Sequence, residues 1–534
     1  MASPLLRELT AADYETLLAW ASAQPDFVHI GGFGAGAGGG TLTGFSALAE
    51  ATEQVDAPAI GSNARAERPD IEGLALRMDE RLARYGLNTR APADREYLIG
   101  GWIGLISYEF GYAREPRLWP LCPGLPVPLL SAGLYLWAAS RHSATGRFWL
   151  WVHPACGAPV RQQLAGLVGA GLNEGSDEFH LTPEAAQGFG DDARLGSDES
   201  VHLTPEGARG FRDGAKLGSD ESIHLTPEGA RGFGDGAGLG SDERLHLTPG
   251  VWQMLRPFRP CQSREEVEAG VQAIRRYIAA GDCYQTNLSQ AFTGVFSGSP
   301  WSAFRALSES HATPYSAFLR VPGGEVLSLS PERFLRVQNG VAETSPIKGT
   351  RPRGGSPEQD RAMAEALQNS EKDRAENLMI VDLLRNDLGR RAAPGSVSVD
   401  RLFALESFPN VHHLVSHIRA TLADGVSPLQ LLFDAFPGGS ITGAPKIRAM
   451  EIIRELEPHW RGPYCGSVFH YGLDGSLDSS IAIRTLLCET EGSENTVHCW
   501  GGGGIVADSV PGEEYEEMLT KVGGLMRFLD RFEG

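Results

Sequence analysis

Apolar and polar residues alternate along this chain with two different periods. Spacings of three and four residues, which are typical of amphipathic helices, occur in residues 11–23, 71–85 and 369–390. Residues 263–281 show the same period and a capping-box start, because Ser263 is followed three residues later by Glu266. Gly281 supplies the stop signal of this segment. We therefore expect helices in both halves of the chain.

Strand-like patterns fill the intervals between these predicted helices. Residues 131–140 and 147–152 are rich in aromatic and branched side chains, and they flank a turn-like sequence, RHSATG. This arrangement predicts a β-hairpin. Residues 100–112 also have the pattern of a strand, in which Gly104 and Gly111 mark places where another segment approaches closely.

Composition divides the chain into three zones. Residues 1–160 mix helix and strand patterns, and residues 251–534 do so more densely. The zone between them, residues 161–250, repeats a unit of about 22 residues of the form GSDESVHLTPEGARGF. Each unit has too few large apolar side chains to offset the entropy lost on ordering. We expect a flexible acidic insert, and a small packed solenoid is the alternative.

The charge and cysteine content exclude several classes of protein. The 67 acidic residues outnumber the 47 basic residues and give a net charge of −20 without any basic block, which argues against nucleic-acid binding. The seven cysteines contain no C-x-x-C pair, and the N-terminus lacks the pattern of a signal peptide. No uncharged stretch supplies the roughly 20 apolar residues of a membrane-spanning helix. We expect a cytoplasmic protein that binds no membrane.

Two short motifs in the second half place an acid and an amine near each other. Glu332 lies in SPERF and Lys348 lies in PIKGT, sixteen residues further on. If the two residues lie on adjacent short strands, a hairpin would bring them to one cavity. The alternative is a solvated surface pair, which is the usual state of a glutamate and a lysine.

Carboxylates on two predicted helices suggest a metal ion. Glu376 lies beside the apolar face of residues 369–390, where a carboxylate needs a cationic partner. Glu514, Glu517 and Lys521 share one face of the predicted C-terminal helix. Mg²⁺ takes one or two carboxylates and keeps water or substrate oxygens as its other ligands. The alternative is an acidic helix start that the helix dipole favours.

Two glycine-rich segments and one arginine complete the candidate chemistry. Residues 438–443 match the first part of a P-loop, but Ala-Pro replaces the Gly-Lys that a nucleotide triphosphatase requires. The four consecutive glycines at 501–504 indicate close approach of a ligand or of another strand. Arg484 is flanked by apolar residues in a predicted strand and therefore needs an anionic partner.

The chain resembles the chorismate-utilising enzyme family in eight motifs, which occur in the family's order. They are GDCYQTNLSQ, SPERF, PIKGTRPRG, AENLMIVDLLRNDLGR, FPGGSITGAPKIRAMEII, SSIAIRT, GGGGIVADS and EEYEE. The resemblance is continuous over residues 260–525, and residues 100–112 resemble the family's N-terminal region. It implies an α+β fold of the anthranilate synthase component I kind, an α/β sandwich of large antiparallel sheets with outer helices. The two ends of the chain would interleave in it.

The resemblance also implies roles for individual residues. Glu332 matches the general acid of the family, and Glu376 and Glu517 match its Mg²⁺ ligands, with Glu514 nearby. The remaining matches are substrate-binding positions. His413 and Thr442 would lie beside the ring of chorismate, and its carboxylates would be bound by Arg484, Lys521 and the amides of Gly502, Gly503 and Gly504.

Two positions distinguish the branches of the family. Gln285 stands where isochorismate and salicylate synthases carry a lysine that activates water, so water is disfavoured as the nucleophile. Lys348 stands where anthranilate synthases carry a small residue, and it resembles the lysine of the aminodeoxychorismate synthases. That lysine attacks C2 of chorismate, and ammonia then attacks C4 to give 4-amino-4-deoxychorismate, the precursor of the p-aminobenzoate part of folate. Anthranilate synthesis and a catalytically inactive scaffold are the alternatives.

The recognised motifs include no source of ammonia, and one residue departs from the family pattern. The chain contains no G-x-C-x-G glutaminase motif, so we expect a separate glutamine amidotransferase subunit. His470 stands where many members carry a tyrosine, and it is a candidate substitute for that residue. The N-terminal region shows no clear signature of tryptophan binding.

Overall fold

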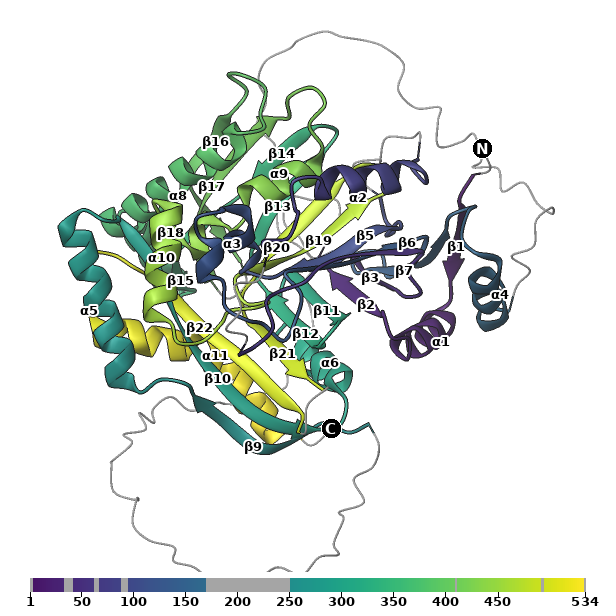
Figure 1. Cartoon of the computed structure of the whole chain (residues 1–534), viewed down its shortest axis with the longest axis horizontal. Helices are drawn as coiled ribbons and strands as arrows, with labels where there is room; N and C mark the ends of the chain where they lie inside the picture. The colour runs from purple at the N-terminus through teal and green to yellow at the C-terminus, as the bar shows by residue number, and fades with distance from the viewer. Residues whose placement is uncertain are drawn as a thin grey trace, which may run out of the picture. The chain divides into compact units, whose positions relative to one another are not determined.

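Two large antiparallel sheets form the framework of the protein (Figure 1). The computed structural model describes residues 3–32, 42–61, 67–87, 95–169, 250–408, 411–490 and 494–532. The predicted repeats lie outside the described residues. Residues 1–172 and 248–534 belong to one compact unit, so the segments before and after the repeats fold together. Within the described ranges, no helix is both long and apolar enough to cross a membrane.

The larger sheet has twelve strands among the described residues. Their order from one edge is β1 (Leu5–Leu9), β8 (Phe148–Val152), β7 (Trp137–His142), β3 (Leu42–Ser46), β2 (Val28–Gly31), β11 (Tyr315–Val321), β12 (Gly324–Ser330), β21 (Thr485–Glu489), β22 (Thr496–Ile505), β10 (Gln285–Ser297) and β18 (Gly443–Ala444). A further strand, β9 (Gln253–Pro260), pairs with β10.

The smaller sheet has ten strands in the same part of the chain. Their order is β15 (Ile347–Pro352), β17 (Val411–Thr421), β14 (Val341–Thr344), β13 (Arg333–Gln338), β20 (Leu477–Ala482), β19 (Gly466–Gly472), β5 (Gly101–Ile106), β6 (Leu130–Tyr135) and β4 (Ala51–Val55), and β16 (Ser398–Ser407) pairs with β17. Pairing of β2 with β11 and of β5 with β19 joins the N-terminal zone to the C-terminal zone in both sheets.

Helices cover the outer faces of the two sheets. They are α1 (Ala11–Ser22), α2 (Leu74–Ala83), α3 (Phe110–Arg114), α4 (Ala158–Leu167), α5 (Arg264–Ala280), α6 (Pro300–Ser310), α7 (Pro357–Gln368), α8 (Glu371–Gly389), α9 (Pro428–Ala435), α10 (Lys446–Leu456) and α11 (Pro511–Arg531), with the 3-10 turns η1 (Trp119–Leu121) and η3 (Gly439–Ile441). Helices α5, α10 and α11 pack on β10 and β22, and α7 and α8 pack on β15 and β17.

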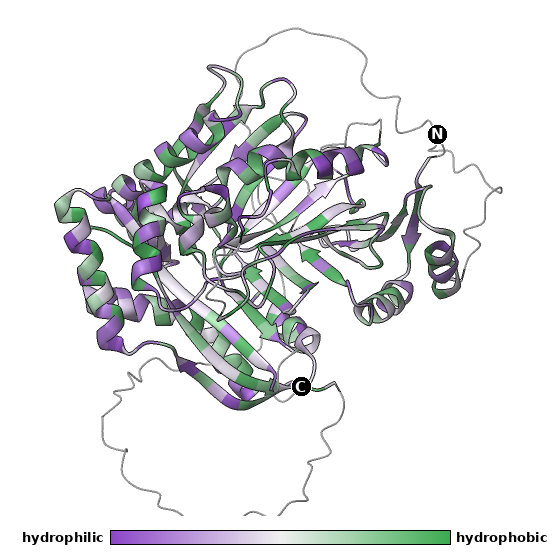
Figure 2. Ribbon diagram, in the orientation of Figure 1, coloured by the Kyte–Doolittle hydropathy of each residue, from purple (hydrophilic) through white to green (hydrophobic). Residues whose placement is uncertain are grey.

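The helix predicted at residues 263–281 is confirmed together with its two ends. Ser263 and Glu266 form the capping box, and Gly281 adopts the left-handed conformation that a helix C-terminus favours, with φ of 83°. The helices generally have one hydrophilic and one hydrophobic side, whereas the central strands are largely hydrophobic or neutral (Figure 2). This difference is expected because a helix buries one face, and both faces of a central strand are covered.

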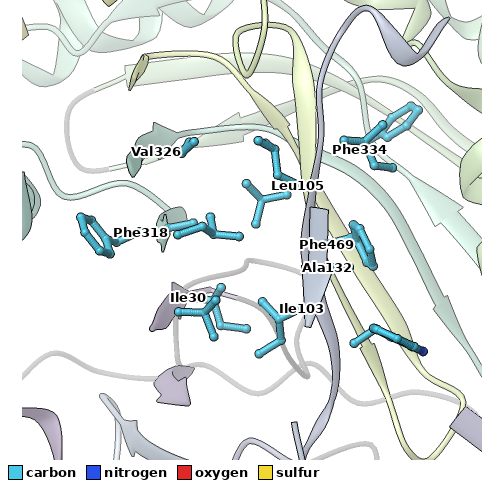
Figure 3. Packing of buried hydrophobic residues seen from close by; sticks show 14 of the residues in the cluster. Ile30, Ile103, Leu105, Ala132, Phe318, Val326, Phe334 and Phe469 are labelled. Carbon is cyan, nitrogen blue, oxygen red and sulfur yellow. The ribbon is translucent and has the colours of Figure 1, made fainter. Parts of the chain in front are cut away.

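The hydrophobic core fills the space between the sheets. Ile30 of the larger sheet faces Ile103 and Leu105 of the smaller sheet (Figure 3). Phe318 lies on the other face of the larger sheet, where its ring packs against Phe304 of α6 at a centroid distance of 5.6 Å. All five side chains are at most 1% exposed. Phe469 lies on the opposite face of the smaller sheet, so apolar side chains cover that sheet on both faces.

Two of the strand predictions need correction. The segment 131–140 is not one strand of a hairpin, because β6 belongs to the smaller sheet and β7 to the larger one. The chain crosses between the sheets at Leu136, which is buried, and only β7 pairs with β8 as predicted. The second correction concerns residues 100–112, in which the strand ends at Ile106 and helix α3 begins at Phe110. Leu136 continues the apolar run on both of its sides, so the sequence pattern shows no boundary between β6 and β7, whereas the polar residues Ser107 and Glu109 do separate the strand from α3.

The predicted close approaches at two glycines are confirmed. A Cβ atom on Gly104 would lie 2.6 Å from the Cβ atom of Ala132 and 2.6 Å from the carbonyl oxygen of Ser131. A Cβ atom on Gly111 would lie 2.8 Å from Pro437. Neither position has room for a side chain.

Gly104→Ala should therefore destabilise the protein by about 1–3 kcal/mol, because the methyl group would push two paired strands apart. The measurement is the free energy of unfolding in urea. Gly389→Ala is the matched control, since a Cβ atom there meets no atom within 4 Å and alanine favours a helix. Equal stability of the two variants would contradict the close contact at Gly104.

Candidate active site

A cavity of about 820 Å³ opens where the two sheets meet helices α8 and α11. Its wall combines residues of β15 from the smaller sheet, residues of β22 from the larger sheet, and residues of the 3-10 turn η3. These elements lie together at the left of Figure 1, although they come from distant parts of the chain. The cavity contains most of the residues that the sequence marks as chemically relevant.

Glu332 lies in this cavity, in the connection between β12 and β13. Its carboxylate oxygen Oε1 accepts a hydrogen bond of 3.2 Å from the Ser440 hydroxyl. Burial raises the pKa of Glu332 above its usual value, and the positive charge of Lys348 and the Ser440 hydrogen bond act against this rise. A carboxyl group with a raised pKa suits the role of a general acid.

Lys348, the second residue of β15, lines the same cavity. Within the described ranges its amine makes no hydrogen bond or ion pair. Its charge nevertheless lowers the pKa values of Glu332, Glu376 and Glu517, against the effect of burial. The amine is therefore near three carboxyl groups and engaged by none.

The expected hairpin of Glu332 and Lys348 is wrong, although both residues do line one cavity. Strands β14 and β17 lie between β13 and β15 in the smaller sheet. The chain reaches β15 only after pairing β14 with β13, and β17 returns later to fill the gap. Both side chains nevertheless line the same cavity, although the two strands that carry or follow them are not neighbours in the sheet.

Three acidic residues face the cavity from two helices, Glu376 from α8 and Glu514 and Glu517 from α11. Burial raises the pKa values of Glu376 and Glu514. Burial acts in the same direction on Glu517, but Lys521, whose amine lies 2.8 Å from Oε1, holds the pKa of Glu517 below its usual value. Glu376 has no hydrogen-bond or ion-pair partner in the part of the chain that the structure describes.

These carboxylates do not by themselves enclose a metal ion. No group of three or more potential ligand side chains among the described residues is close enough to hold one. The three residues do share the cavity, and two of them are acids whose burial no protein cation fully compensates. This arrangement suits an ion that takes some of its ligands from water or substrate.

The four glycines at 501–504 form part of strand β22 rather than a loop. Gly502 pairs with Ser289 and Gly504 with Asn287 of β10, whereas β21 pairs with β22 only as far as Cys499. The glycines therefore have a strand partner on one side and line the cavity. A Cβ atom on Gly502 would lie 2.7 Å from the hydroxyl of Tyr464, so the predicted close approach is confirmed.

Arg484 supplies a positive charge on the cavity wall. Its backbone adopts a left-handed conformation, with φ of 52°, between β20 and β21. The side chain is exposed to the cavity, yet the surrounding protein removes enough water from it to lower its pKa. No acidic or hydrogen-bonding partner of this guanidinium occurs within the described ranges. Such a group suits an anionic ligand.

Three residues that the sequence suggested lie outside the cavity lining. Thr442 is fully buried, and its hydroxyl donates to the carbonyl oxygen of Gly438 at 2.9 Å. His413 is half-buried, with its Nδ1 atom 2.9 Å from the hydroxyl of Thr350. His470 is buried in the core, with Nε2 3.1 Å from the carbonyl oxygen of Ile99, and burial lowers its pKa to about 4.

Other residues reach the cavity without having been predicted. They include Asn287, Lys372, Asp373, Ser440 and Tyr464. Asn287 and Ser440 lie within motifs that the sequence did mark, GDCYQTNLSQ and FPGGSITGAPKIRAMEII. Neither residue type carries a strong chemical signal by itself, and only the tertiary contacts identify them.

The chain belongs to a family described as chorismate binding enzyme, whose pattern matches residues 236–527, more than half of the sequence. It is 52% identical over 273 residues to aminodeoxychorismate synthase component 1 of Klebsiella aerogenes, which covers 51% of this chain and 60% of that protein. It is 42% identical over 270 residues to anthranilate synthase component 1 of Geobacillus stearothermophilus, covering 51% of this chain and 52% of that protein. Each alignment thus spans less than two thirds of the relative.

A solved structure confirms the fold that the resemblance implied. Anthranilate synthase component I from Streptococcus pneumoniae TIGR4 superposes with a TM-score of 0.63 and covers 91% of this chain and 92% of its own. Its sequence is 23% identical, so the comparison concerns architecture. Both the family and the fold predicted from the motifs are therefore correct.

Chorismate, the ligand that the family description names, is a dicarboxylate. If Arg484 binds one of these carboxylates, Arg484→Gln should weaken binding by roughly 10- to 100-fold, because a charge-assisted hydrogen bond contributes about 1.5–3 kcal/mol. Binding is measured by quenching of tryptophan fluorescence. Arg385→Gln is the control, since Arg385 forms an exposed pair with Asp382. Equal affinities of the two variants would exclude Arg484 from the binding site.

Proposed function

We propose that this chain aminates chorismate at C4 to give 4-amino-4-deoxychorismate, as an aminodeoxychorismate synthase component 1. The observation that carries this proposal is Lys348, a cavity-lining amine that has no partner among the described residues and that lies near Glu332. The higher identity to the Klebsiella relative than to the Geobacillus relative supports the same assignment.

The reaction consists of two displacements. The neutral amine of Lys348 attacks C2 of chorismate, the ring double bonds shift, and the bond from C4 to its hydroxyl breaks. Glu332 donates a proton to that hydroxyl, which leaves as water. Ammonia then attacks C4, the double bonds shift back, and the bond between C2 and Lys348 breaks. After a proton returns to Glu332, chorismate and ammonia have become 4-amino-4-deoxychorismate and water.

The cationic groups of the cavity bind and orient the substrate. Arg484 and Lys521 lie on the cavity wall and offset the charge of the two substrate carboxylates. The glycines of β22 carry no side chains and so leave the backbone open to the substrate, while at 502 and 504 glycine is also required because a side chain would collide with Tyr464 and Gln285. Gln285 itself is buried beside Gly504 and carries no basic group that would activate water.

Mg²⁺ is the cofactor in this proposal, and Glu376, Glu514 and Glu517 are the residues that would hold it. The carboxylate of Glu376, which has no partner among the described residues, supports the assignment. When bound, Mg²⁺ would supply positive charge that offsets the repulsion between these carboxylates and an anionic substrate.

Ammonia comes from a separate glutamine amidotransferase subunit in this proposal. The component number in the name of the Klebsiella relative supports a multi-component enzyme. The product would supply the p-aminobenzoate branch of folate biosynthesis. Anthranilate synthesis is the second candidate, because relatives with that name match the same half of the chain.

The function is tested with the purified chain, chorismate, Mg²⁺ and an ammonium salt, followed by a lyase that converts 4-amino-4-deoxychorismate to p-aminobenzoate. p-Aminobenzoate that forms only after lyase addition supports the proposal. Anthranilate formed without lyase would support the second candidate, and unchanged chorismate would exclude both. Glutamine should replace the ammonium salt only when the amidotransferase subunit is present.

Lys348→Ala should slow formation of 4-amino-4-deoxychorismate by roughly 100-fold or more, because the covalent step is lost. Lys348→Arg is the matched control: it keeps the positive charge near Glu332, but a guanidinium stays protonated and cannot attack C2. Both variants should be slow in the coupled assay. Activity retained in the arginine variant would mean that only the charge of Lys348 matters.

Glu376→Gln should raise the Mg²⁺ concentration that gives half-maximal turnover by about tenfold or more, because a neutral amide binds Mg²⁺ weakly. The measurement is a titration of the chelator-treated protein with Mg²⁺. Asp382→Asn, an exposed residue of the same helix, serves as the control. Turnover that is independent of Mg²⁺ would rule out the ion as a cofactor.

A further inference from the structure

Ser440 is the hydrogen-bond donor that holds the Glu332 side chain. Its hydroxyl lies 3.2 Å from Oε1, and no other described group donates to either carboxylate oxygen. Both residues line the cavity. The other oxygen, Oε2, is left without a donor in the described part of the protein.

The backbone of Glu332 is fixed independently of this contact. Its amide donates to the Ser330 hydroxyl at 3.1 Å, and its carbonyl oxygen accepts from the amide of Ile481 at 3.0 Å. These bonds anchor the residue between β12 and β20, but they leave the side-chain torsions free. Ser440, which comes from a different part of the chain, supplies the contact that selects one position of the carboxylate.

Buried hydrogen bonds fix the backbone of the segment that carries Ser440. Arg461, which is 1% exposed, donates to the carbonyl oxygen of Ile441 at 3.0 Å and pairs with Glu457 at 2.7 Å. The amide of Asn287 donates to the carbonyl oxygen of Thr442 at 2.8 Å. The serine hydroxyl is therefore presented by a rigid support rather than by a free loop, which is what a positioning group requires.

We propose that Ser440 is a positioning residue for the general acid: its hydroxyl binds Oε1 and thereby directs Oε2, which carries the transferred proton, toward the substrate. This inference rests on the proposed function, in which Glu332 protonates the departing C4 hydroxyl. After that transfer the same hydrogen bond stabilises the carboxylate that remains. A serine suits both states because its hydroxyl rotates freely and can donate or accept.

Besides Ser440, burial and two neighbouring groups bear on the ionisation of Glu332. Burial raises its pKa, and Lys348 of β15 lowers it. Cys465, just before β19, also interacts with Glu332, but burial raises the pKa of this thiol to about 12, so it is neutral at working pH. Removing the Ser440 hydrogen bond leaves burial opposed only by Lys348, so the pKa of Glu332 rises further.

The test compares Ser440→Ala with Ser440→Thr, which retains a hydroxyl, across a range of pH. The rate falls at high pH where Glu332 loses its proton, so loss of the hydrogen bond should move this alkaline limb to higher pH. At its optimum the alanine variant should lose about tenfold in kcat, with KM for chorismate within about twofold of the wild type. The threonine variant should recover both properties.

The coupling between the two residues is measured in a Glu332→Gln background, where Ser440→Ala should cause no additional loss. An unshifted alkaline limb, or equal losses from Ser440→Ala with and without Glu332, would overturn the proposal. A lower melting temperature with parallel changes in kcat and KM would also overturn it, in favour of a purely structural role.

The assay follows chorismate consumption as well as product identity, so the two proposals fail separately. Anthranilate as the product would overturn the proposed function but not the role of Ser440. The C4 hydroxyl must leave in that reaction too, so a general acid is still needed. A wild-type chain that consumes no chorismate would overturn both.

Discussion

The packing of two antiparallel sheets against each other is the constraint on which the rest of this structure depends. Ile30 of one sheet and Ile103 and Leu105 of the other exclude water between them (Figure 3). Because each sheet contains strands from both ends of the chain, neither end forms its part of the core alone. The cavity lies where residues of both sheets meet helices α8 and α11.

This framework holds ionisable side chains in a partly desolvated site, where their charged forms are unfavourable. Glu332, Glu376 and Arg484 are all desolvated enough to shift their pKa values toward the neutral form, and protein partners compensate them only in part. Groups of this kind cost folding free energy, which the apolar core must offset. Their concentration in one cavity is typical of a site whose charges are completed by a ligand or an ion.

Much of the fold and most of the candidate site could be predicted from the sequence. Capping residues and periodicity are local, so the helix at 264–280 and both of its ends follow from neighbouring residues. Ordered motifs identified the family, and ten of the twelve predicted site residues line the cavity. The pairing of β13, β14, β17 and β15 was not predictable, because strand order depends on contacts between residues far apart in sequence.

The sequence by itself determined which reactive side chains the site can use. They are an acid in SPERF, an amine in PIKGT and carboxylates on two helices, together with a run of glycines. Only the tertiary structure decided which of them share a cavity. It brought Lys348 and Glu332 together across two intervening strands, and it kept Thr442 and His470 in the interior. It also added Ser440, whose hydroxyl becomes relevant only through its hydrogen bond to Glu332. The physical reason is that a side chain's chemistry is local, whereas its partners and its access to water are set by packing between distant segments.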